Sequence, residues 1–99
     1  MLTLPIKKKW FDMICAGEKK EEYRAITPYY IERFKNIGLL NQFGEPTGKE
    51  ACIVLRNGYG KNMPEVTVSV EAEIGFGCPA WGAEPGTPYY ILKIKERYA

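Results

Sequence analysis

One short stretch of the sequence concentrates the residue types that could do chemistry. The run EKKEEYR, from Glu18 to Arg24, holds three carboxylates and three cationic side chains in seven positions. Histidine is absent from the chain, which removes the commonest general base, the usual zinc ligand and any histidine-assisted nucleophile. Any chemistry must therefore use lysine, carboxylates, hydroxyls or tyrosine, and the charged run supplies the first two.

The backbone conformation of this run decides which of its charges can meet. In a strand, successive side chains alternate between two faces, so Lys20, Glu22 and Arg24 share one face. Glu22 and Arg24 can then point into one space. The alternative is a solvent-exposed strand whose charges pair weakly, each exposed pair contributing about 0–1 kcal/mol. Spacing alone favours this second interpretation.

The elements before and around the run must position it. Alternating apolar residues predict a strand over residues 2–6, which Pro5 confines to a sheet edge or a strand end. Helical spacing of apolar residues predicts a short helix over residues 7–16, and Gly17 suits the position after its end, where φ is positive. The charged run then belongs to a strand over residues 20–26.

A second helix and three further strands are predicted after the run. Thr27 suits an N-cap, Pro28 suits the first helical position, and Gly38 ends the helix. Residues 39–50 and the glycine- and proline-rich residues 75–88 have loop composition, and strands are predicted over residues 51–56, 66–74 and 89–95. About five strands and two short helices, with most strands after the helices, predict an α+β domain whose sheet is strongly curved or closed.

Composition limits the class of protein. The 99 residues, 45% of them apolar, fit one globular domain spanning residues 1–99. The net charge of +2 is too small to indicate a strongly basic nucleic-acid binder. No run resembles a signal peptide or approaches the roughly 20 apolar residues of a membrane span, so we expect a cytoplasmic protein without a membrane partner. Cys15, Cys52 and Cys78 match no disulfide or metal pattern, so we expect reduced, mostly buried thiols, no metal ion and no other cofactor.

A sequence motif combines part of the charged run with the glycine before it. Gly17, Lys19, Glu22 and Arg24 spell G-x-K-x-x-E-x-R. This motif resembles the signature of ASCH domains, a branch of the PUA-like superfamily. The resemblance extends over most of the chain, since that family has a strand, a short helix, this motif, a second helix and then barrel strands. It implies a small PUA-like (ASCH) β-barrel of about five strands with two short flanking helices.

The resemblance also implies a cleft in which the charged residues of the motif gather around RNA, a nucleoside or a nucleotide. In such a cleft Lys19 and Arg24 can hold phosphate or carbonyl oxygens, Arg24 through two parallel hydrogen bonds. Glu22 can orient Arg24 or accept hydrogen bonds from a base. Lys19 is singled out by the resemblance and not by the strand alternation.

The segment LRNGYG adds Arg56, Asn57 and Tyr59 as candidates for the same cleft. Asn57-Gly58 favours a hairpin turn, because such turns need positive φ values. An arginine close to a tyrosine also suits phosphate binding combined with base stacking. For Arg56 and Tyr59, a turn surface and a ligand contact are both open.

Two other functions are alternatives to a binding module. Some PUA-like relatives hydrolyse N4-acylated cytidine, and ribonuclease activity is attributed to the family, so the resemblance makes Lys19 and Glu22 candidate catalytic residues of a small hydrolase. The amidohydrolase motif reads Gly-x-Lys-x-x-Thr, and Glu22 stands where its threonine nucleophile would be, which argues against the same mechanism. The third possibility is a regulatory protein-interaction module.

Overall fold

The computed structural model describes residues 1–60 and 62–98. Its elements in chain order are β1 (Thr3–Ile6), α1 (Lys8–Cys15), β2 (Glu21–Ala25), α2 (Pro28–Asn36), β3 (Glu50–Asn57), β4 (Glu65–Phe76), the 3₁₀ turn η1 (Pro79–Trp81) and β5 (Pro88–Tyr98). None of the described helices is long and apolar enough to cross a membrane.

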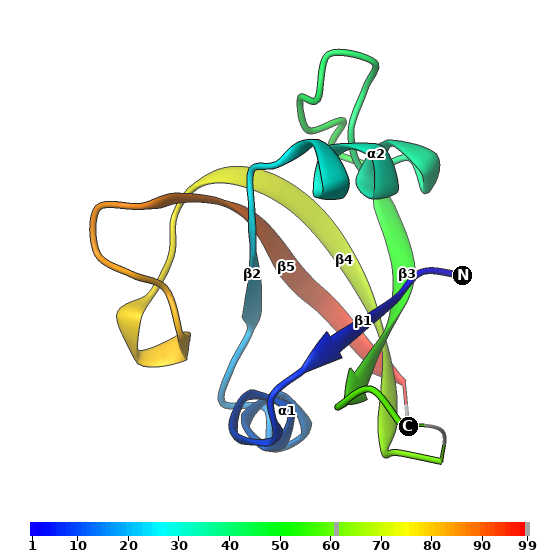
Figure 1. Cartoon of the computed structure of the whole chain (residues 1–99), viewed down its shortest axis with the longest axis vertical. Helices are drawn as coiled ribbons and strands as arrows, with labels where there is room; N and C mark the ends of the chain where they lie inside the picture. The colour runs from blue at the N-terminus through cyan, green and yellow to red at the C-terminus, as the bar shows by residue number, and fades with distance from the viewer. Residues whose placement is uncertain (61, 99) are drawn as a thin grey trace.

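The five strands form one curled sheet in the order β1-β3-β4-β5-β2. β1 pairs parallel with β3, and the other neighbours are antiparallel. The register between β4 and β5 shifts at Ser69 and Val70, and such a bulge bends a strand and increases its twist. These two strands, the longest in the sheet, wrap it into a half-barrel (Figure 1). The predicted α+β domain of five strands and two short helices, with a strongly curved sheet, is confirmed.

The hydrophobic core lies between the curled sheet and the two helices. α1 buries Phe11 and Ile14, and α2 buries Phe34 completely. The Phe34 ring meets the ring of Tyr90 on β5 edge-on, with centroids 5.8 Å apart. Burying a side chain of this size contributes roughly 1.5–3 kcal/mol, so these contacts hold both helices on the sheet.

Local sequence signals set the helix ends as predicted. Gly17 follows the end of α1 with a φ of 79°, a value that glycine adopts without steric cost. At the start of α2, the Thr27 hydroxyl accepts a hydrogen bond from the Tyr30 amide at 3.4 Å, and Pro28 occupies the first helical position. The segment between these two signals is short, so β2 and its charges are held between the two helices.

The expected burial of the thiols is wrong for two cysteines. Cys15 and Cys52 are exposed, and Cys78 is half-buried. Cys52 occupies the outward face of β3, because the neighbouring Ile53 takes the inward position. Cys15 is the last residue of α1 and lies beyond the buried part of that helix.

The glycine-rich segment 75–88 is more regular than predicted. β4 continues to Phe76, η1 follows, and β5 begins at Pro88. The segment packs on β2, where the Cys78 amide donates to the Tyr23 hydroxyl at 2.8 Å. A Cβ atom on Gly77 would lie 2.5 Å from the Tyr23 ring, so this close approach requires glycine.

β1 and β2 are the two edges of the sheet, and the half-barrel is open between them. Pro5 lies in β1, as expected for an edge strand. Proline has no amide hydrogen to donate, so it cannot pair fully with a neighbouring strand on each side. Within the described part of the chain, no strand pairing joins β1 to β2. Instead, Nη2 of Arg24 donates to the Pro5 carbonyl oxygen at 2.8 Å. The Arg24 end of the charged run therefore lies at this opening.

Candidate functional site

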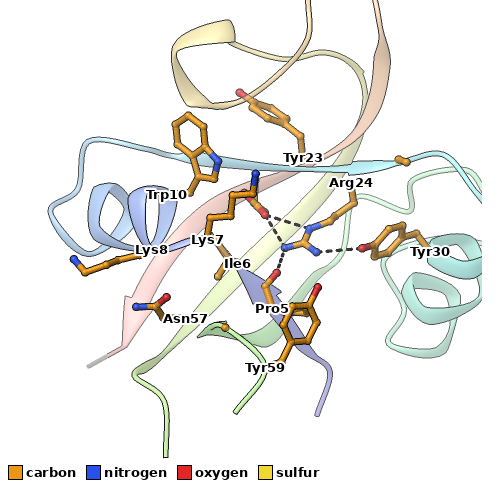
Figure 2. A pocket seen from close by; sticks show the side chains of 13 residues that line it. Pro5, Ile6, Lys7, Lys8, Trp10, Tyr23, Arg24, Tyr30, Asn57 and Tyr59 are labelled. Carbon is orange, nitrogen blue, oxygen red and sulfur yellow. Dashed lines mark hydrogen bonds and ion pairs between the residues drawn. The ribbon is translucent and has the colours of Figure 1, made fainter. Parts of the chain in front are cut away.

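A pocket of about 670 Å³ occupies the opening between the two sheet edges. Figure 2 shows the side chains that line it, which come from both edge strands and both helices as well as from Asn57 and Tyr59. Its lining comes from β1, the start of α1, β2, α2 and the end of β3, namely Pro5, Ile6, Lys7, Lys8, Trp10, Glu22, Tyr23, Arg24, Ala25, Tyr30, Asn57, Gly58 and Tyr59.

Arg24 is held by three different neighbours on one side of this pocket. Its Nη2 and Nε donate to Oε2 of Glu22 at 2.7 and 3.2 Å. Its Nη2 also donates to the Pro5 carbonyl oxygen, and its Nη1 donates to the Tyr30 hydroxyl at 3.1 Å (Figure 2). Burial lowers the pKa of Arg24, but the Glu22 carboxylate and the Tyr30 hydroxyl outweigh burial and raise it. The guanidinium therefore stays charged and is fixed in one orientation.

Lys19 lies on the other side of Glu22 and is fully enclosed. Its side chain is 0% exposed, and Nζ lies 3.2 Å from Oε1 of Glu22. The same Nζ donates to the carbonyl oxygens of Glu21 at 2.5 Å and Trp81 at 2.7 Å. An ammonium group has three hydrogens, so these three acceptors use all of them.

Two aromatic rings complete the enclosure of Lys19. Nζ lies 4.7 Å from the centroid of the Tyr23 ring and 5.4 Å from that of Trp10, within the range of cation–π attraction. Burial lowers the pKa of Lys19, and the Glu22 carboxylate opposes that shift. Lys19 does not line the pocket between β1 and β2. Its position favours a role in holding Glu22 and the η1 segment.

The motif residues thus form one cluster, Lys19–Glu22–Arg24, with a carboxylate between two cations. Glu22 is only 7% exposed, so the interpretation as a solvent-exposed strand is wrong for this residue. Glu22 and Arg24 do point into one space, as the strand alternation predicted. Lys20 does not join them, because it precedes β2 and is exposed.

The candidates of the LRNGYG segment separate in the structure. Asn57 and Tyr59 line the pocket, and the Tyr59 side chain is 91% exposed. Arg56 does not line it. Its Nη2 lies 2.7 Å from Oε1 of Glu65, the residue directly opposite on β4. The geometry therefore places Arg56 in a cross-strand pair of the hairpin.

Sequence reasoning missed several pocket residues that lie outside the charged run. Lys7, Lys8 and Trp10 come from the first turn of α1 and the residue before it, and Tyr30 comes from α2. A signal for the lysines exists in the sequence. The first turn of α1 has no acidic residue and no side-chain cap, although a helix N-terminus favours negative charge. Lysines at this end oppose the helix dipole. This unfavourable placement of positive charge could have marked Lys7 and Lys8 as candidate binding residues.

Comparison with protein-family models, curated proteins and solved structures gives no match to this chain. Among residues 1–60 and 62–98, no group of three His, Cys, Asp or Glu side chains could hold a metal ion. The fold and the site define a curled α+β half-barrel with an aromatic and charged pocket between its sheet edges.

Proposed function

We propose that the chain is a PUA-like domain of the ASCH type that binds RNA or a nucleotide in the pocket between β1 and β2. One observation carries the proposal. The same pocket combines aromatic rings, a fixed carboxylate–guanidinium pair and lysines at the start of a helix. Its volume of about 670 Å³ lies within the roughly 300–1,000 Å³ typical of small-ligand sites.

The aromatic and amide groups of the pocket suit a nucleobase. Tyr59 lies at the pocket with an almost fully exposed ring, and base–aromatic stacking contributes about 1–3 kcal/mol per base. The Asn57 carboxamide can both donate and accept hydrogen bonds. Glu22 lines the same space and can accept from an amino group, because a carboxylate oxygen that already faces Nζ of Lys19 can accept a further hydrogen bond.

The start of α1 suits a phosphate. The first amide groups of a helix have no partner within the helix and carry a partial positive charge. Lys7 and Lys8 line the pocket at this point. Nζ of Lys8 also donates to Asp12 at 2.5 Å, which partly neutralises its charge. Lys7 is therefore the main cation for binding a phosphate.

Arg24 takes a supporting role in this proposal. Its hydrogen bonds to Glu22 and Pro5 occupy Nε and Nη2, the adjacent donors that could otherwise bind a phosphate through two parallel hydrogen bonds. Arg24 then orients the Glu22 carboxylate and links the two sheet edges. The ligand meets Glu22, Asn57 and Tyr59 directly.

The hydrolase alternative with Lys19 and Glu22 gains no support from the geometry. A general base must be within hydrogen-bond reach of the proton that it removes. Nζ of Lys19 is enclosed and its three hydrogens already face three acceptors within the protein, so it is out of reach of a ligand proton. A charged ammonium also has no lone pair to act as a base. No specific observation favours the regulatory protein-interaction module.

Direct binding tests the proposal. Titration of the protein with nucleoside monophosphates and short RNA is compared with titration of Tyr59→Ala and Lys7→Ala. Tyr98→Ala and Lys95→Ala serve as controls, because both residues are exposed and lie outside this pocket. We expect Tyr59→Ala to weaken binding about 5- to 150-fold, from the stacking energy. We expect Lys7→Ala to weaken it most at low salt.

Two results would contradict the proposal. The first is that none of these ligands binds at micromolar protein. The second is that the pocket variants bind as well as the control variants. Product formation from N4-acetylcytidine or RNA that Lys19→Ala abolishes, in a variant that remains folded, would instead establish the hydrolase.

A further inference from the structure

The outer surface of α2 carries an ordered aromatic and cationic pair, which we call the α2 platform (Tyr29 and Arg33). Tyr29 is 56% exposed in the first turn of α2. Cζ of Arg33 lies 3.4 Å from the centroid of the Tyr29 ring, and its Nη1 donates to the Tyr29 carbonyl oxygen at 3.2 Å. Residues four apart share one helix face, so each group holds the other in position.

The α2 platform adjoins the pocket. The rings of Tyr29 and Tyr30 meet edge-on, with centroids 5.0 Å apart. Tyr30 lines the pocket and accepts a hydrogen bond from Arg24. Tyr30 also stacks on the fully buried Phe34 at 5.6 Å, which fixes its ring. Aromatic surface therefore continues from the pocket wall onto the outside of α2.

The charge of Arg33 is available to a ligand. Among the residues that the structure describes, no carboxylate forms an ion pair with its guanidinium. The neighbouring Glu32 lies 3.9 Å from Lys35. A guanidinium that a ring orients and no carboxylate neutralises can bind a phosphate and stack against a base.

We propose that the ligand of the pocket is single-stranded nucleic acid, and that its next nucleotide lies on the α2 platform. The neighbouring base stacks on the Tyr29–Arg33 pair, and Arg33 binds the phosphate between the two nucleotides. This inference rests on the proposed function, because it extends the ligand out of the same pocket. Every base has an aromatic face that can stack, so the α2 platform increases affinity without a preference for sequence. A mononucleotide fills the pocket and leaves the platform unused.

Ligands of two lengths separate the platform from the pocket. The probes are the four homo-oligoribonucleotides of about six nucleotides, within the site sizes of such proteins, and the corresponding mononucleotides. The variants are Tyr29→Ala, Tyr29→Leu and Arg33→Gln. Tyr29→Leu keeps a larger apolar side chain than alanine, without an aromatic ring, in case Tyr29→Ala is unstable. The controls are Tyr98→Ala and Lys35→Gln, and thermal unfolding verifies that each variant is folded.

We expect the wild-type protein to bind its preferred oligonucleotide more tightly than the mononucleotide. Both Tyr29 variants should weaken oligonucleotide binding about 5- to 150-fold and leave mononucleotide binding unchanged. Arg33→Gln should reduce the slope of log K against log salt concentration by about 0.7 for the oligonucleotide. The controls should alter neither measurement.

Three results would overturn the inference, and they differ in what they say about the pocket. Equal affinity of the wild-type protein for both lengths would reject binding at the α2 platform and would leave the proposed function of the pocket intact. Platform variants that behave like the controls do the same. Absence of binding to every oligonucleotide and mononucleotide rejects the proposed function and the platform together.

Discussion

The β2 pair Arg24–Glu22 and the hairpin pair Arg56–Glu65 join the same two residue types at the same distance. In each, Nη2 of the arginine lies 2.7 Å from a glutamate oxygen. The side chains of the first pair are each 10% exposed, whereas those of the second are 34% and 43% exposed. Among residues 1–60 and 62–98, the first pair shares its carboxylate with a further buried cation, Lys19, and the second does not.

The difference shows that enclosure, more than the pairing itself, sets the energetic role of a charge. Water screens an exposed pair, which typically contributes about 0.2–1 kcal/mol. In an enclosed pair, loss of one partner leaves the other charge buried without compensation, at a cost of about 3–5 kcal/mol. The pair on β2 therefore shapes the pocket, and the hairpin pair is a surface contact.

The largest expected effect comes from removing the shared carboxylate. Glu22→Gln leaves Lys19 and Arg24 buried without an anion, so the free energy of unfolding should fall by about 3–5 kcal/mol. Glu65→Gln is the matched variant in the hairpin and should cost about 1 kcal/mol or less. Chemical denaturation measures both values. Equal losses in the two variants would show that enclosure makes no difference here.

Removal of the buried ammonium should have the next largest effect. Lys19→Met leaves the carbonyl oxygens of Glu21 and Trp81 without their donor, and each unsatisfied group costs about 1–3 kcal/mol. We expect a loss of about 2–4 kcal/mol in denaturant unfolding and faster amide exchange in η1. Lys20→Met, at the adjacent exposed position, should change stability by about 0.5 kcal/mol or less. A neutral Lys19→Met would show that this lysine does not hold the segment.

Arg24→Lys keeps the charge but removes the planar set of donors. The ammonium cannot reach Glu22, Pro5 and Tyr30 in the same geometry, so we expect a loss of about 1.5–3 kcal/mol and weaker ligand binding. Arg56→Lys should cost about 0.5 kcal/mol or less and leave binding unchanged. Denaturation and ligand titration of both variants give the comparison. If Arg56→Lys impairs binding as much as Arg24→Lys, the hairpin arginine belongs to the site.

The smallest effect is on the pH dependence of stability. Burial lowers the pKa of folded Lys19 below its ordinary value of 10.5. Between the folded pKa and 10.5 the unfolded chain binds more protons, so the Lys19 contribution to stability rises with pH. Lys93, which is half-buried, shows the opposite sign, because its hydrogen bond to Glu73 raises its pKa above 10.5. Its contribution is complete below 10.5 and disappears as the pH rises through the folded pKa.

Two variants isolate these contributions. The measurement is the unfolding free energy of the wild-type protein minus that of Lys19→Met or Lys93→Met, from about pH 7 to about pH 11. The difference should grow with pH below 10.5 for Lys19 and decrease above 10.5 for Lys93. A difference that is flat for Lys19 would show that its enclosure does not disfavour the charged form.

Much of the fold was predictable because its signals are local. Gly17 and Thr27 delimit the helices through backbone conformation and capping, and Pro5 marks an edge strand through its missing amide hydrogen. The shared direction of Glu22 and Arg24 follows from strand alternation alone. Each of these depends on residues within one turn or one strand.

The composition of the site was less predictable, because distant segments build it. Lys19 meets the carbonyl oxygen of Trp81, 62 positions later in the chain. Tyr59 reaches the pocket from just beyond the end of β3, and Lys7 reaches it from the residue before α1. No spacing rule links these positions. Their meeting depends on how far the sheet curls and on which of its edges face each other.

The sequence by itself determined the order of the elements, the ends of the helices and the face of β2 that carries Glu22 and Arg24. Only the tertiary structure decided which of its similar charges are enclosed. The physical reason is that capping and alternation act over a few neighbouring residues, whereas the strength of a charge interaction depends on the exclusion of water. That exclusion comes from α1, η1 and the sheet edges together. Arg24 and Arg56 are the same residue type, and they differ in how far the fold shields each of them from water.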